Sequence, residues 1–224
     1  MKIILVRHAP GDHQLRPDII AGRCPDAELT SKGIEMARSA SRLIIEEFGL
    51  QIDSIDTMPF EMFSSPSRRA RQTAEQMIFG LNESEHSHKR PSDVRIIESL
   101  DELSQGDWEG RPRDQTYTEN VNAQLKDKDI FFAPPKGESI YDATYRMLSA
   151  VEELHMHAQI TQTTPVAVTH NMAIKSLLGA VKGWSRKEVR AHNIPNVSMS
   201  QFDVAIFDSG LMTVGYPNHE TSSK

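Results

Sequence analysis

The chain has 224 residues, of which 38% are hydrophobic and 25% charged, and its formal net charge is −6. This composition is ordinary for a globular protein and excludes a wholly disordered chain. The acidic balance argues against general binding to nucleic acid or to anionic membranes. Cys24 is the only cysteine in the sequence, so an internal disulfide and a four-cysteine zinc site are both excluded.

Strand-like and helix-like segments alternate along the chain. A short, continuously apolar run predicts a strand that is covered on both faces, and a stripe of apolar residues at helical spacing predicts an amphipathic helix. In chain order we predict a strand at 3–6, a long loop at 9–29, a helix at 30–48 capped by Thr30, a strand at 62–64, a helix at 66–80 with Pro66 in its first turn, a strand at 94–97, a weak helix at 114–127, a helix at 138–160, a strand at 165–169, a helix at 172–181 and strands at 197–207 and 210–215.

This alternation predicts an α/β three-layer sandwich, in which helices flank a mostly parallel central sheet. The sequence contains no repeat and no linker, so we predict a single domain over residues 1–224. Its core spans about 3–180, its last strands 197–215, and a short polar tail 217–224. The first apolar run is too short for a signal peptide, and no segment approaches the roughly 18 apolar residues of a membrane span. We therefore expect a cytoplasmic protein without membrane contact.

Two of the predicted strands end in histidine, one at His8 directly after Arg7 and the other at His170. A lone histidine is more often a packed or solvated side chain than a catalytic one. Parallel neighbours in an open α/β sheet, however, bring their carboxyl ends to the same edge, where such sheets bind ligands. The two histidines are therefore candidates for one shared site.

Six motifs follow one another in an order that is typical of a known family. They are Arg7-His8-Ala9, residues 28–33, residues 64–74, Leu100-Asp101-Glu102 with residues 106–110, Gly137-Glu138-Ser139, and residues 168–171. On these motifs the chain resembles the histidine phosphatase superfamily, also called the phosphoglycerate mutase-like family, from residue 3 to about residue 180. The resemblance implies the fold of that family and a reaction that passes through a phosphohistidine.

The resemblance also implies a role for each matched residue. His8 would be the nucleophile that takes up the phosphoryl group, with its second ring nitrogen donating to a fixed acceptor. Arg7, Arg69 and His170 would donate hydrogen bonds to the phosphoryl oxygens, and arginine suits this task because its charged, planar group donates two parallel bonds. Glu102 would protonate the leaving oxygen, which requires a raised pKa. Without the resemblance, the local sequence predicts that Arg69 is a solvated helix residue and that Glu102 is part of an acidic loop.

Three further residues are candidates for substrate binding. Gln14, or its neighbour His13, stands where the family often has an asparagine. Arg23 lies in the same loop and either binds a second anionic group of the substrate or is an ordinary surface residue. Asn171 follows His170 where family members commonly have glycine, and asparagine tolerates a positive φ better than most residues. The sequence predicts no cofactor and no metal, and it leaves a homodimer open.

Three functions remain to be weighed. The first is a metal-independent phosphatase acting on a small phosphorylated metabolite. The second is a cofactor-dependent phosphoglycerate mutase that uses the same phosphohistidine. Mutases usually carry a longer insert after the acidic motif, and the short segment 111–136 therefore favours a phosphatase. The third, a binding module without activity, is disfavoured because all five catalytic positions hold competent residue types.

Overall fold

The computed structural model describes residues 1–48, 60–82, 93–206, 212–215 and 220–221. Its strands are β1 (Lys2–Arg7), β2 (Phe60–Ser64), β3 (Val94–Ile96), β4 (Thr164–Thr169), β5 (Met199–Ile206), β6 (Met212–Gly215) and β7 (Glu220–Thr221). Its α-helices are α1 (Ser31–Phe48), α2 (Arg68–Asn82), α3 (Arg113–Thr116), α4 (Glu119–Lys128), α5 (Ile140–Thr161), α6 (Asn171–Lys182) and α7 (Arg186–Ala191). Short 3₁₀ turns lie in the connections, the first at Asp12–Leu15.

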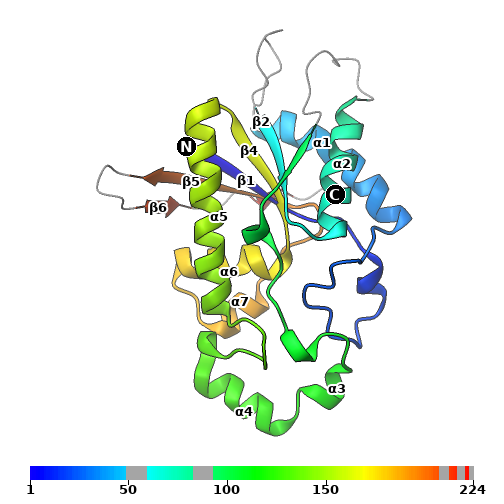
Figure 1. The fold of residues 1–224 in the computed structure, drawn as a ribbon, viewed down its shortest axis with the longest axis vertical. Coiled ribbons are helices and arrows are strands. Elements are labelled where there is room, and N and C mark those ends of the chain that lie inside the picture. The colour runs from blue at the N-terminus through cyan, green and yellow to red at the C-terminus, as the bar shows by residue number, and fades with distance from the viewer. Residues whose placement is uncertain (49–59, 83–92, 207–211, 216–219, 222–224) are drawn as a thin grey trace.

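One sheet runs through the molecule, in the strand order β3-β2-β4-β1-β5-β6, with β7 paired to β5. Strands β1 to β4 pair in parallel, whereas β5 is antiparallel to β1, β6 and β7. Successive side chains of β1 face opposite sides: Ile4 packs in the core with α1 and α2, and Leu5 in the core with α5 and α6. Helices thus cover both faces of the sheet (Figure 1), which confirms the predicted α/β sandwich.

Most predicted elements are present, with shifted ends. Thr30 caps α1 as predicted, since its hydroxyl accepts the N–H of Gly33 at 3.0 Å. The prediction that Pro66 lies in the first turn of a helix is wrong: α2 begins at Arg68, and the carbonyl of Ser67 accepts the first helical N–H groups. The predicted weak helix is divided into α3 and α4, with Thr118 as the N-cap of the second. Of the predicted polar tail, only β7 falls within the described residues.

The long loop 9–29 lies beyond the carboxyl ends of the parallel strands, near α3 (Figure 1). Isolated bridges hold it in place, one between Gly11 and Leu29 and one between Ile19 and Pro112. The start of α1 packs so closely on the loop that a Cβ at Gly33 would collide with the carbonyl of Pro10. The loop is therefore fixed over the sheet edge where the two histidines were expected. None of the described helices combines the length and the apolar character that crossing a bilayer requires.

Candidate active site

His8 and His170 meet at the same sheet edge, as the sequence predicted. Strands β1 and β4 are parallel neighbours with Arg7 aligned with Thr169, and each histidine is the next residue along its chain. The two ring centroids lie 5.1 Å apart. The register of two parallel strands thus brings together side chains that are far apart in the sequence.

The imidazole of His8 is held in one tautomer. Its Nδ1 donates to the carbonyl of Ala9 at 2.7 Å, and its Nε2 accepts from Nε of Arg69 at 3.3 Å. Because His8 is only 3% exposed, burial lowers its pKa well below the ordinary 6.5, and the positive charge of Arg69 lowers it further. Nε2 is therefore unprotonated at neutral pH, with its lone pair directed at Arg69, and the fixed acceptor predicted for the other ring nitrogen is the backbone carbonyl of Ala9.

The guanidinium of Arg69 lies between the two histidines. Besides its contact with His8, it donates from Nη2 to Nδ1 of His170 at 3.1 Å. Its Nη1 donates to the carbonyls of Arg23 at 2.6 Å and Cys24 at 2.8 Å, both in the long loop. Arginine suits this place because its five donors lie in one rigid plane. Burial lowers the pKa of Arg69, while the carboxylates of Glu102 and Asp101 act in the opposite direction.

His170 lies behind Arg69 and is fully buried. Since its Nδ1 accepts from Arg69, its Nε2 carries the proton in the neutral ring and donates to the hydroxyl of Ser65 at 2.7 Å. Burial lowers the pKa of His170 well below 6.5. The structure therefore places His170 in contact with the arginine. Its direct contact with a phosphoryl group stays a prediction.

Glu102 is held at the N-terminus of α6. Its carboxylate accepts the N–H groups of Leu103 at 2.8 Å, Ala173 at 3.1 Å and Met172 at 3.3 Å. A helix N-terminus favours the charged form of a carboxylate. Burial nevertheless outweighs these hydrogen bonds and raises the pKa of Glu102 above 4.5. A raised pKa is the property that a proton donor needs.

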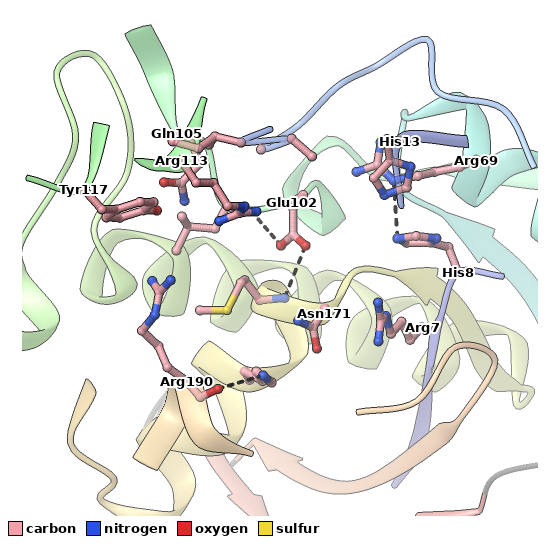
Figure 2. A pocket seen from close by; sticks show the side chains of 16 residues that line it. Arg7, His8, His13, Arg69, Glu102, Gln105, Arg113, Tyr117, Asn171 and Arg190 are labelled. Atoms are coloured by element: carbon pink, nitrogen blue, oxygen red, sulfur yellow. Dashed lines mark hydrogen bonds between the residues drawn. The ribbon is translucent and has the colours of Figure 1, made fainter. Parts of the chain in front are cut away.

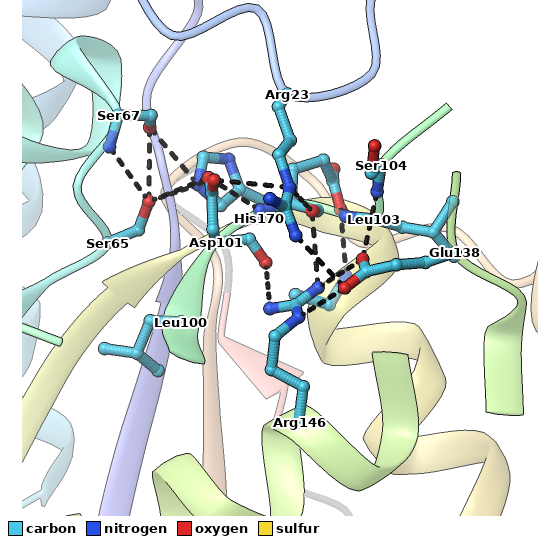
Figure 3. Close-up of polar contacts among 12 residues, drawn as sticks. Arg23, Ser65, Ser67, Leu100, Asp101, Leu103, Ser104, Glu138, Arg146 and His170 are labelled. Atoms are coloured by element: carbon cyan, nitrogen blue, oxygen red, sulfur yellow. Dashed lines mark hydrogen bonds and ion pairs between the residues drawn. The ribbon is translucent and has the colours of Figure 1, made fainter. Parts of the chain in front are cut away.

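A cluster of ion pairs fixes the backbone around Glu102 (Figure 3). Arg146 donates to both carboxylate oxygens of Glu138, each at 2.9 Å, and also to the carbonyls of Ser99, Asp101 and Glu102 at 2.8, 2.7 and 3.3 Å. Arg23 joins the cluster by donating to Glu138 at 3.0 Å and to the carbonyl of Glu102 at 3.2 Å. The motif residue Glu138 thus holds Arg146 and Arg23 in contact with the backbone carbonyl of Glu102.

A cavity of about 270 Å³ opens in front of His8 (Figure 2). Among the residues that line it are Arg7, His8, His13, Arg69, Glu102, Asn171, Lys175 and Arg190. Three of these lining residues have a buried polar atom without a hydrogen-bond partner among the described residues: Nε of Arg7, Nδ1 of His13 and Oδ1 of Asn171. Such atoms are rare in folded proteins and indicate room for a polar ligand.

The other candidates from the loop take different positions. Gln14 lies beside Asn196, with its Nε2 3.5 Å from the Asn196 amide oxygen, and Arg23 belongs to the ion-pair cluster around Glu138. His13, rather than Gln14, reaches the cavity, where burial and the charge of Arg69 lower its pKa to about 4. The described residues contain no group of three or more histidine, cysteine or acidic side chains placed to hold a metal ion.

Sequence reasoning missed two groups of functional residues. Lys175 and Arg190 line the cavity, and Arg146 donates hydrogen bonds to the backbone carbonyls of Ser99, Asp101 and Glu102. A signal for Lys175 existed, because residues four apart share one face of a helix and Asn171 had already been identified. Arg190 lies on α7, which was not predicted, although Ser185 and Glu188 form a capping box at its start.

The comparisons with known proteins agree with this geometry. The family model described as histidine phosphatase superfamily (branch 1) matches residues 3–210. A 2,3-bisphosphoglycerate-dependent phosphoglycerate mutase from Xanthobacter autotrophicus is 30% identical over 181 residues, which are 79% of this chain and 78% of the mutase. A mycobacterial glucosyl-3-phosphoglycerate phosphatase, solved with VO3, has a TM-score of 0.74 at 22% identity over 99% of both chains. Phosphoserine phosphatase from Entamoeba histolytica has a TM-score of 0.69 at 24% identity, over 100% of this chain and 98% of that one. The chain belongs to branch 1 of the histidine phosphatase superfamily.

Proposed function

We propose that the protein is a phosphatase that hydrolyses small phosphomonoesters through a phosphohistidine on His8. One observation carries the proposal: the unprotonated Nε2 of His8 contacts the guanidinium of Arg69 at the wall of a cavity that Arg7 and Glu102 also line. A nucleophile, two cations and an acid are the groups that phosphoryl transfer requires.

In the first step, the lone pair on Nε2 of His8 attacks phosphorus in line with the ester oxygen. A new N–P bond forms as the P–O bond breaks. Arg7 and Arg69 stabilise the negative charge that spreads over the equatorial oxygens. Glu102, whose pKa is raised by burial, gives its proton to the departing alkoxide when it is in the protonated form.

In the second step, water hydrolyses the phosphohistidine. Glu102, now a carboxylate, removes a proton from the water as its oxygen attacks phosphorus. The N–P bond breaks, the electron pair returns to Nε2 of His8, and phosphate leaves. The cycle ends with both residues in their starting states.

The second candidate is a phosphoglycerate mutase, which would return the phosphoryl group to a second substrate. The 30% identity to a curated mutase favours it, whereas the short segment 111–136, which holds α3 and α4, favours the phosphatase. The same residues would serve both reactions. The fate of the phosphoryl group on His8 therefore separates the two.

The test measures phosphate release from p-nitrophenyl phosphate, together with interconversion of 2- and 3-phosphoglycerate in the presence of 2,3-bisphosphoglycerate. A phosphatase gives steady phosphate release and an acid-labile phosphoenzyme that is absent in His8→Ala. The control variant is His157→Gln, since His157 pairs with Glu61 away from the cavity. Efficient mutase activity with only trace hydrolysis would overturn the proposal in favour of the mutase. Phosphate-ester binding without turnover would instead indicate a binding module.

A further inference from the structure

The cavity in front of His8 adjoins a second, larger one. This second cavity, of about 800 Å³, lies between α4 and α7 and shares Arg113, Tyr117 and Arg190 with the first. Figure 2 shows these three side chains on the side of the first cavity away from His8. A ligand bound at His8 can therefore extend past Arg190 into the second cavity.

The second cavity is strongly basic, although the chain as a whole is acidic. Five cationic side chains line it, Arg113, Lys126, Arg186, Lys187 and Arg190, against one carboxylate, Asp129. That carboxylate is already engaged, because its Oδ1 accepts the backbone N–H of Arg186 at 3.0 Å. In a chain of net charge −6, this concentration of positive charge attracts an anion.

Lys175 lines the first cavity together with Arg190, which the two cavities share. Lys175 is only 6% exposed, and its ammonium group donates to the backbone carbonyl of Arg190 at 3.4 Å. Burial lowers its pKa, and the positive charges of Arg7 and Arg190 lower it further. No Asp or Glu of the described residues forms an ion pair with Lys175 or Arg190. A buried cation without an anionic partner is costly, and a bound anion would offset that cost.

We propose that the substrate is a bisphosphorylated molecule whose second phosphate is bound by Lys175 and Arg190 and lies toward the α4–α7 cavity. The proposal rests on the proposed phosphatase activity and deepens it by naming the substrate class. A phosphate carries close to two negative charges, which matches the surplus of cations better than a neutral group does. Because this site lies across the cavity from His8, a longer carbon chain between the two phosphates fits it better than a short one.

The experiment compares chemically matched esters of two lengths. For each length, kcat/KM is measured for the diol bisphosphate and for the monophosphate of the same diol, using 1,6-hexanediol and 1,3-propanediol. The six-carbon bisphosphate is expected to exceed its monophosphate by more than about tenfold, well above the statistical factor of about two for two equal phosphates. The three-carbon pair is expected to stay near that statistical factor.

Arg190→Gln is expected to lower the six-carbon ratio to near the statistical factor of about two, and Lys126→Gln is expected to lower it less. Both side chains are exposed, so neither change threatens folding. Arg42→Gln is the matched control, an exposed arginine on α1 that is expected to leave the ratio unchanged.

Several results would overturn the inference. The inference is refuted if the six-carbon ratio of the wild type is near two, if Arg190→Gln leaves that ratio unchanged, or if the three-carbon pair shows an equal preference. Turnover of the monophosphates would still support the proposed phosphatase activity in each of these cases. If no ester is hydrolysed, the proposed function fails. Calorimetric titration with 1,6-hexanediol bisphosphate then decides the inference alone: weaker binding by Arg190→Gln supports it, and equal binding refutes it.

Discussion

Replacing Glu102 by glutamine tests the acid role that we propose for this carboxyl group. The wild-type carboxylate accepts three backbone N–H groups, from Leu103, Met172 and Ala173. Glutamine has nearly the same size but one acceptor oxygen, so at least one of these donors loses its partner, at a cost of about 1–3 kcal/mol of stability. The larger effect is on the reaction, because proton donation by a positioned acid contributes roughly 10²–10⁴-fold to the rate.

The assay measures kcat/KM of the wild type and Glu102→Gln with an alkyl phosphate and with p-nitrophenyl phosphate. The nitrophenolate ion leaves without a proton, so we expect a loss of about 10²–10⁴-fold for the alkyl ester and less than about tenfold for the aryl ester. With the alkyl ester, the wild-type rate falls as the pH rises through the raised pKa of Glu102, since the acid must be protonated. Glu102→Gln lacks this decline. Equal losses on both esters would refute the acid role.

Three further changes test the electrostatics and packing around the site. Burial lowers the pKa of His8 and His170, so stability is greatest above the unfolded value of 6.5 and falls as the pH drops below it, by up to about 1.4 kcal/mol per pH unit for each histidine. Urea unfolding of His8→Asn at several pH values should show a shallower decline, and an unchanged slope would contradict this account. Arg146→Met leaves the carboxylate of Glu138 partly unpaired. The variant should lower the free energy of unfolding by about 2–3 kcal/mol, which is less than the loss for a fully buried pair. The kcat/KM of Arg146→Met should fall more for alkyl than for aryl esters, whereas an equal fall for both would indicate a purely structural role. Leu154→Ala empties a fully buried position in the core under α5 and should cost about 2–5 kcal/mol in the same urea assay with kcat/KM unchanged, and a cost below about 1 kcal/mol would mean that the core closes over the gap.

The sequence predicted the parts of the site that depend on the ends of strands. Apolar runs identified β1 and β4, and the rule that parallel strands share an edge predicted that His8 lies beside His170. Arg69 and Glu102 needed the family resemblance, because their local sequence also fits a solvated helix and an acidic loop. The structure explains why that resemblance was informative: Arg69 contacts both histidines, and Glu102 accepts the N–H groups of Met172 and Ala173, which closely follow His170.

Other parts could not be predicted, because they depend on contacts between distant segments. Arg190 reaches the cavity only through the packing of α7 against α6, and no local pattern specifies that packing. Gln14 was predicted to bind substrate because it, or His13, stands where the family often has an asparagine, and Arg23 because it lies in the same loop. The path of the loop turns the two side chains to Asn196 and Glu138. Pro66 was placed inside α2 on its intrinsic preference for first turns, which the hydrogen bonds of Ser67 override.

The way in which Arg69 is anchored has a consequence for how such an enzyme can acquire new substrates. Its Nη1 rests on two main-chain oxygens of the long loop, those of Arg23 and Cys24, rather than on any loop side chain. The loop can therefore exchange the side chains that it presents to a ligand without disturbing the anchoring of Arg69. Insertions or deletions next to these two carbonyls would displace the acceptors of Nη1, so changes of residue type disturb Arg69 less here than changes of loop length.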